Sequence, residues 1–167
     1  NIILKRPFAQ LNIGTNDMEE AKASLNTEAL KSSVKVLGIF SSMNLMTGIP
    51  DPNTSTVVTF GLNAIPKEKF TVGDRTFDYL ALNYLLVSDQ KGLVNCEFTC
   101  TDGAGATTDT RTIDNVPVQR NYRTNIFGSL LTGSVDLGIT IDPNFATPDY
   151  GVAAPWDGKT VTEPKQT

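Results

Sequence analysis

Ser32 and Lys35 have the spacing S-x-x-K, in which a lysine base activates a serine nucleophile. That chemistry needs both side chains on one face of a helix, but the alternating apolar residues around them predict a strand. In a strand, positions three apart point to opposite faces. The 167 residues contain no histidine, which excludes Ser-His-Asp and Cys-His nucleophiles and histidine-bound zinc. We therefore predict that the chain is not an enzyme and needs no cofactor.

Two cysteines, Cys96 and Cys100, are separated by three residues within an apolar segment. In a strand their thiols share one face but lie about 13 Å apart. A disulfide requires Cα atoms within about 7 Å, and two thiols are too few for a four-ligand zinc site. We interpret them as packed free thiols, with a local disulfide as the alternative.

Acidic residues offer a weak case for a cation site. Asp102, Asp109 and Asp114 lie in or near a glycine-rich loop, where oxygen ligands could meet calcium, but their spacing differs from an EF-hand loop. We interpret them as solvated and predict no metal. The formal charge of −4 argues against nucleic acid as a partner, because binding to phosphates relies on Lys and Arg.

Aromatic side chains could stack on sugar rings. Tyr79 and Tyr84 lie in a long apolar run, so we place them in the core. Tyr150 and Trp156 lie in a polar, proline-containing segment and are the better candidates for stacking on a ligand.

A polar cluster lies between Pro117 and Phe127. We interpret it as part of one long strand, whose polar side chains hydrogen-bond neighbouring loops rather than a substrate. Its members are Arg120, Asn121, Tyr122, Arg123, Thr124 and Asn125.

Short alternating segments dominate the rest of the sequence. Strands are predicted around residues 7–14, 32–39, 55–62, 93–101 and 134–142, and a short helix over 17–25 capped by Thr15 or Asn16. The run from Phe77 to Val87 fits two strands, or a strand and a helical turn. The fold class is therefore mainly β, a β-sandwich of about seven or more strands with one short helix, over residues 1–147. Residues 148–167 are predicted to be an extended tail or linker. No apolar run reaches the length of a membrane-spanning helix, so we expect no direct membrane span.

Three segments together resemble the fimbrillin superfamily, the type V pilins and their relatives from Gram-negative gut and oral bacteria. They are RPFAQLNIGT (residues 6–15), YLALNYLL (79–86) and NVPVQRNYRTNI (115–126). The resemblance implies a transthyretin-like β-sandwich that is exported as a lipoprotein precursor to the outer membrane surface. It also implies assembly into fimbriae, in which a strand from one subunit completes its neighbour by β-augmentation.

Two departures from the family pattern refine this expectation. Pro7 follows the dibasic pair Lys5–Arg6 and hinders cleavage after Arg6, so we expect the processing site in a preceding domain and this chain to be the C-terminal domain. The tail lacks the apolar alternation of a donor strand.

We therefore expect a structural or adhesive subunit of surface fimbriae, or a fimbrillin-like domain of a larger cell-surface adhesin. The alternative is a secreted carbohydrate-binding module without catalysis. Expected partners are other pilus subunits or domains, and glycans or proteins of host or bacterial surfaces.

Overall fold

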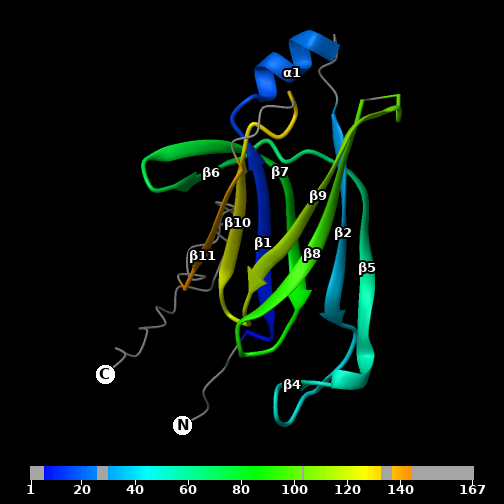
Figure 1. Cartoon of the computed structure of the whole chain (residues 1–167), viewed down its shortest axis with the longest axis vertical. Coiled ribbons are helices and arrows are strands. Elements are labelled where there is room, and N and C mark those ends of the chain that lie inside the picture. Colours follow the sequence, from blue (N-terminus) through cyan, green and yellow to red (C-terminus); the bar gives the residue numbers. More distant parts are fainter. Residues whose placement is uncertain (1–5, 26–29, 103, 133–136, 144–167) are drawn as a thin grey trace, which may run out of the picture.

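The computed structural model describes residues 6–25, 30–102, 104–132 and 137–143, and these form a β-sandwich. Within them, one sheet has five strands in the order β11-β10-β1-β7-β6 and the other has four in the order β5-β2-β8-β9 (Figure 1). The helix α1 lies at one end of the sandwich, and a small hairpin formed by β3 and β4 lies at the other. The prediction of a mainly β sandwich with one short helix is confirmed.

The apolar run from Phe77 forms one long strand, not two elements. The predicted tail, 148–167, lies outside the described residues, as do residues 134–136 of the predicted last strand. In chain order, the elements are β1 (Phe8–Thr15), α1 (Met18–Leu25), β2 (Lys31–Phe40), β3 (Met43–Asn44), β4 (Ile49–Pro50), a 3-10 turn (Pro52–Thr54), β5 (Ser55–Ala64), β6 (Lys69–Val72), β7 (Arg75–Leu86), β8 (Gly92–Thr101), β9 (Thr107–Val118), β10 (Arg123–Gly128) and β11 (Gly138–Asp142).

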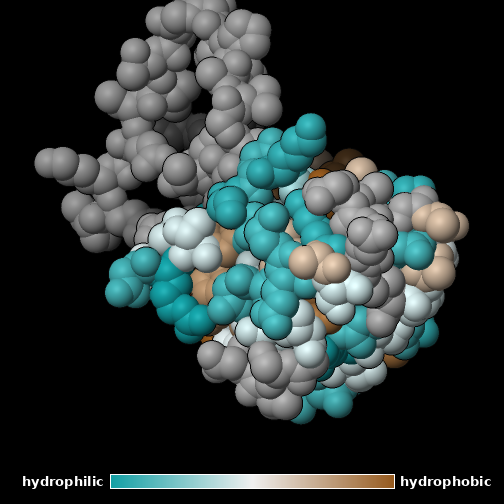
Figure 2. Space-filling view, turned by 90° about the horizontal axis from the view of Figure 1, so that it is seen from above, coloured by the Kyte–Doolittle hydropathy of each residue, from teal (hydrophilic) through white to brown (hydrophobic). Residues whose placement is uncertain are grey.

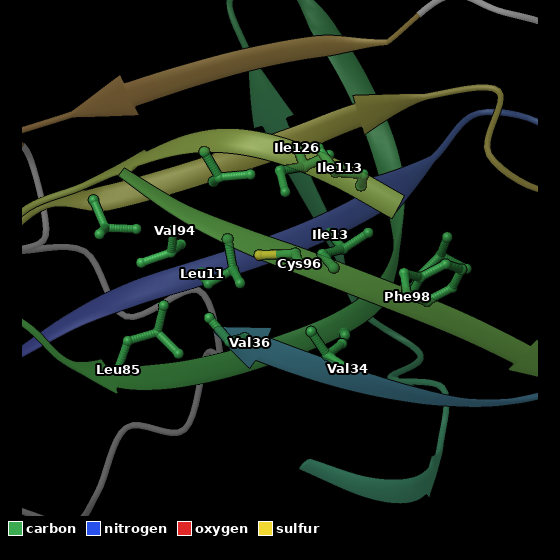
Figure 3. Close-up of a cluster of buried hydrophobic side chains, with 14 of the residues drawn as sticks. Leu11, Ile13, Val34, Val36, Leu85, Val94, Cys96, Phe98, Ile113 and Ile126 are labelled. Atoms are coloured by element: carbon green, nitrogen blue, oxygen red, sulfur yellow. The ribbon is translucent and has the colours of Figure 1, made fainter. Parts of the chain in front are cut away.

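The core lies between the two sheets (Figure 3). Alternate residues of each strand point inward because a strand places successive side chains on opposite faces. Leu11 and Ile13 of β1 meet Val34, Val36 and other apolar side chains of the second sheet, and all four are at most 1% exposed. The interleaved side chains exclude water from this layer, which is the main favourable term for the fold.

Strand β1 is buried on both faces, which its alternating pattern did not predict. It lies at the centre of its sheet, parallel to β10 and antiparallel to β7. On its outer face, Gln10 donates to Asn12, and Asn12 donates to Asn125 of β10 at 2.8 Å. Buried amides require partners of this kind, so the asparagines satisfy each other across the parallel strand pair.

The start of α1 is fixed by Asp17 rather than by the predicted caps, Thr15 or Asn16. The carbonyl of Asp17 accepts the first helical hydrogen bond, from the backbone N–H of Ala21 at 3.0 Å. Its side chain instead binds the segment after β10, accepting from the backbone N–H groups of Leu131 and Thr132 at 3.1 and 2.8 Å. Asp17 therefore joins the β1–α1 junction to the chain beyond β10.

Candidate functional site

Among the described strands, only the short strand β6 pairs with the outer edge of β7. On one side β7 pairs with β1 along the whole of β1, while on the other side β6 pairs only with residues 75–78. One further backbone bond joins the N–H of Tyr79 to the carbonyl of Glu68. No described strand pairs with this edge from residue 80 to residue 86, although the hydroxyl of Ser32 donates to the carbonyl of Leu80. An unpaired strand edge offers a row of backbone donors and acceptors to another strand.

The opposite sheet extends beyond this open edge. Strand β2 packs over β7, and β5 is the next strand outward, so β5 lies over the space beside β7. Val58 and Phe60 of β5 pair with Val36 and Val34 of β2, whose side chains point into the core. Val58 and Phe60 therefore point inward too, but they are only half-buried, because no described strand lies beneath them.

A cavity of about 220 Å³ lies between this edge of β7 and Phe60 of β5. Its walls include Leu80 and Asn83 of β7, Val34 of β2 and Phe60 of β5. The Oδ1 atom of Asn83 is buried there and has no hydrogen-bond partner in the described part of the chain. We call this space the β5–β7 groove. Its shape and its unused backbone groups suit one extended strand.

The polar cluster before Phe127 is divided between a turn and the start of β10, so the prediction of one long strand is wrong. Strand β9 ends at Val118 and β10 begins at Arg123. Asn121 lies between them with φ of 68°, in the left-handed region that asparagine tolerates better than most residues. The N–H of Tyr122 donates to the carbonyl of Gln119 at 3.0 Å and closes the turn.

Side chains of this turn and of the start of β10 bind neighbouring loops and strands. Arg120 donates through Nη1 to the carbonyl of Gly48 in the small hairpin, and Nη2 lies 3.6 Å from the carboxylate of Asp89. Arg123 forms an ion pair with Asp142 of β11 at 3.1 Å. Thr124 donates to the carbonyl of Pro117 at 2.6 Å. These contacts link the turn to the hairpin, β10 to β11, and β10 to the end of β9.

Both cysteines are buried thiols that form no disulfide, as predicted. Burial raises the pKa of the Cys96 thiol from 9.0 to about 12, because an apolar environment disfavours the thiolate. A thiol that remains protonated is a poor nucleophile and a poor metal ligand. Within the described residues, no group of three His, Cys, Asp or Glu side chains could hold a metal ion.

The remaining sequence candidates are dispersed. Tyr79 is fully buried, as predicted, but Tyr84 is 51% exposed, because the two tyrosines lie on the outer face of the sheet and only Tyr79 is covered there by Phe70. Tyr150 and Trp156 lie outside the described residues. Ser32 donates to the carbonyl of Leu80, whereas Lys35 points to the other side of β2 and pairs with Glu97. The S-x-x-K spacing therefore brings no nucleophile and base together.

Comparison with known proteins identifies a family. The model of the Family of unknown function (DUF6562) matches residues 1–162. The chain belongs to this family. No curated protein matches this DUF6562 chain. Among its described residues, no helix has the length and hydrophobicity needed to span a bilayer.

Two solved structures are similar to this DUF6562 chain at low identity. A protein from Bacteroides ovatus ATCC 8483 assigned to cell adhesion is 17% identical, with a TM-score of 0.42, and the match covers 83% of this chain and 45% of that one. A fimbrial protein from Bacteroides vulgatus ATCC 8482 is 12% identical, with a TM-score of 0.33, and the match covers 81% and 53%. The chain spans about half the length of each.

Proposed function

We propose that this chain is a non-enzymatic structural or adhesive module of a bacterial surface fimbria or of a larger cell-surface adhesin. It joins a neighbouring subunit or domain by accepting an extended strand in the β5–β7 groove. The observation that carries the proposal is the extension of β5 beyond the edge of β7, where none of the described strands pairs with residues 80–86.

The added strand is stabilised by two kinds of contact. Its backbone pairs with residues 81–86 of β7, and its alternate side chains cover Phe60 in the cavity and Val58 beside it. Burying a whole apolar side chain contributes about 1.5–3 kcal/mol, so covering these two half-buried residues contributes about 1 kcal/mol each. Backbone pairing gives affinity, and the cavity selects which side chains fit.

The sequence resemblance supports the same function. The three segments that resemble fimbrillins lie in β1, in β7, and in the end of β9, the following turn and β10. Strands β10, β1 and β7 are adjacent in the five-stranded sheet, so the resemblance covers its three central strands, including the strand that carries the open edge. The transthyretin-like type of sandwich and export as a lipoprotein precursor to the outer membrane surface belong to this proposal.

Photo-crosslinking in the bacterium that encodes the chain tests the proposal. A benzophenone amino acid replaces Tyr84, an exposed aromatic residue on β7, in the full-length gene product. We expect adducts with a surface subunit or domain, and mass spectrometry should place the crosslink in an extended segment of the partner. The same amino acid at Thr99, on the outer face of β8, is the control and should give few adducts.

A charge in the groove should prevent assembly. Phe60→Lys places an ammonium group inside the cavity, while Thr59→Lys places it on the other face of β5, where the side chain is exposed. We expect the first variant to lose the Tyr84 adducts and surface assembly, and the second to retain both. Equal crosslinking by both variants, or retention of the full-length product in the cytoplasm, would refute the proposal.

A further inference from the structure

Asn83 is an inward-pointing polar residue of the β5–β7 groove. Its cross-strand neighbour on β1 is Leu11, which is fully buried in the core, so the side chain of Asn83 points between the sheets too. Its Oδ1 atom is buried and has no hydrogen-bond partner within the described part of the chain. Asn63 of β5 also lines the cavity, but its amide donates to the carbonyl of Gly61 at 2.8 Å. Because buried amides are normally hydrogen-bonded, the unpartnered oxygen of Asn83 points to a missing neighbour.

The backbone of β7 presents hydrogen-bonding groups to the same groove. Gln10 of β1 lies opposite Tyr84, and the N–H of Gln10 donates to the carbonyl of Tyr122 at 3.0 Å, on the side of β1 away from β7. Opposite residues in an antiparallel pair either exchange hydrogen bonds or both point away from each other. The N–H and carbonyl of Tyr84 therefore point to the outer edge of β7. The residues two before and two after it share this direction, because the pairing with β1 is regular from residue 81 to residue 86.

A strand that pairs with this edge brings a side chain next to Asn83. Neighbouring strands hold directly opposite Cβ atoms about 4.5–5.5 Å apart on the same face. Asn83 is only partly buried, so water still reaches part of it in the free chain. The added strand removes that water. An apolar side chain beside Asn83 would leave the amide with neither water nor a partner, which is unfavourable, whereas a hydroxyl or amide side chain replaces the lost hydrogen bonds.

We propose that the β5–β7 groove selects an extended strand that carries Ser, Thr or Asn beside Asn83 and apolar residues at the next inward position on either side. The inward residues of β7 that flank Asn83 are Ala81 and Leu85, which are buried and apolar. Phe60 of β5 lines the cavity above them. This inference rests on the proposed function, because it requires the groove to accept a strand, and it adds the side-chain pattern that the strand must have.

The two ends of the open edge limit the register of a short strand. At one end the N–H of Tyr79 is already bonded to the carbonyl of Glu68, and at the other β7 ends at Leu86. A seven-residue strand centred on Asn83 spans this edge. Its central residue lies beside Asn83 whether the strand runs parallel or antiparallel to β7, so a symmetric test peptide needs no knowledge of its direction.

Amide NMR titration with synthetic peptides tests the inference. The probes are Lys-Val-Thr-Thr-Thr-Val-Lys, with a central threonine, and Lys-Val-Thr-Val-Thr-Val-Lys, with the isosteric valine. A third peptide, Lys-Thr-Thr-Val-Thr-Val-Lys, has its inward threonine off centre. Seen from the α1 end, the described surface is mainly hydrophilic, with hydrophobic residues only in small separate areas, so that face offers the peptides no broad apolar surface for non-specific binding (Figure 2).

We expect all three peptides to shift the amide signals of Leu82, Tyr84 and Leu86. The peptide with the central threonine should bind about fivefold more tightly than the other two, because it alone gives the Asn83 amide a partner. Asn83→Leu should remove this preference. That variant should still fold, because it replaces an unpartnered amide at an inward position with an apolar group. Asn63→Leu is the matched control on the opposite wall and should keep the preference.

The outcomes separate this inference from the proposed function. Absence of shifts on β7 with every peptide at millimolar concentration would overturn both, because the groove would then accept no strand. Shifts on β7 with equal affinity for the central threonine and valine would overturn the side-chain pattern alone. The same threonine preference in the Asn83→Leu variant would also overturn it while leaving strand addition intact.

Discussion

Replacing Asp17 with asparagine tests whether this carboxylate joins the β1–α1 junction to the chain after β10. Its Oδ2 atom accepts from the N–H groups of Leu131 and Thr132 and from the Thr132 hydroxyl at 2.8 Å. The asparagine oxygen can occupy the Oδ2 position, with its amide nitrogen beside the Thr15 hydroxyl. Hydrogen bonds to a charged group contribute about 1.5–3 kcal/mol and neutral ones about 0.5–1.5. Three bonds each weakened by about 1 kcal/mol give an upper value of ~3 kcal/mol.

We expect a loss of about 2 kcal/mol from the free energy of unfolding, because Leu131 is only half-buried, Thr132 is exposed, and water can replace part of the interaction. Urea unfolding followed by far-UV circular dichroism measures this loss, since the unfolding free energy falls linearly with urea. Asp51→Asn is the matched control, because Asp51 also accepts a backbone N–H but is exposed. Its cost should stay below about 0.5 kcal/mol. Equal costs for the two variants would refute the role assigned to Asp17.

Three other experiments probe contacts elsewhere in the molecule. Gly14→Ala should lower the free energy of unfolding by about 1–3 kcal/mol, because a Cβ there would overlap the ring of Phe70. Gly61→Ala on β5 is the control and should be near neutral in the same urea assay, because no atom lies within 4 Å of the Cβ that it adds. Iodoacetamide should not modify the buried Cys96 at pH 8 unless urea unfolds the chain. The free energy of unfolding should fall above pH 9, because the Cys96 thiol ionises there in the unfolded chain but keeps its proton in the folded chain until about pH 12. Arg120→Gln should raise the rate of amide hydrogen exchange in the hairpin by about tenfold while leaving β1 protected, because the substitution removes the contact with the hairpin carbonyl. Unchanged hairpin exchange would contradict that assignment.

The exposure of the two tyrosines of β7 depends on the neighbouring strand and not on the local sequence pattern. Tyr79 and Tyr84 belong to the same apolar run, and both point to the outer face of the sheet. Phe70 of β6 covers Tyr79, while β6 ends before it can reach Tyr84. The length of β6 therefore determines both the exposure of Tyr84 and the open edge of β7, and no periodicity within the β7 segment reports the length of its neighbour.

The polar cluster from Arg120 to Asn125 shows a second feature that the sequence pattern did not predict. Its residues are compatible with a strand by alternation, and only the positive φ of Asn121 shows that the chain reverses there. Asparagine is frequent in such turns, so the residue offered a weak signal that the surrounding strand formers obscured. The partners of Arg120 and Arg123 lie 72 and 19 residues away, and such distant contacts require the tertiary structure.

The sequence by itself determined the fold class, several of the longer strands, the short helix and the absence of histidine chemistry. Those conclusions depend on side-chain type and on the period of two along a strand, which are local properties. The tertiary structure alone decided that β1 is buried on both faces, that β5 extends beyond β7, and that the hairpin exposes Leu45 and Met46. Each of these depends on which strands become neighbours, and that choice minimises exposed apolar area over the whole chain rather than within any one segment.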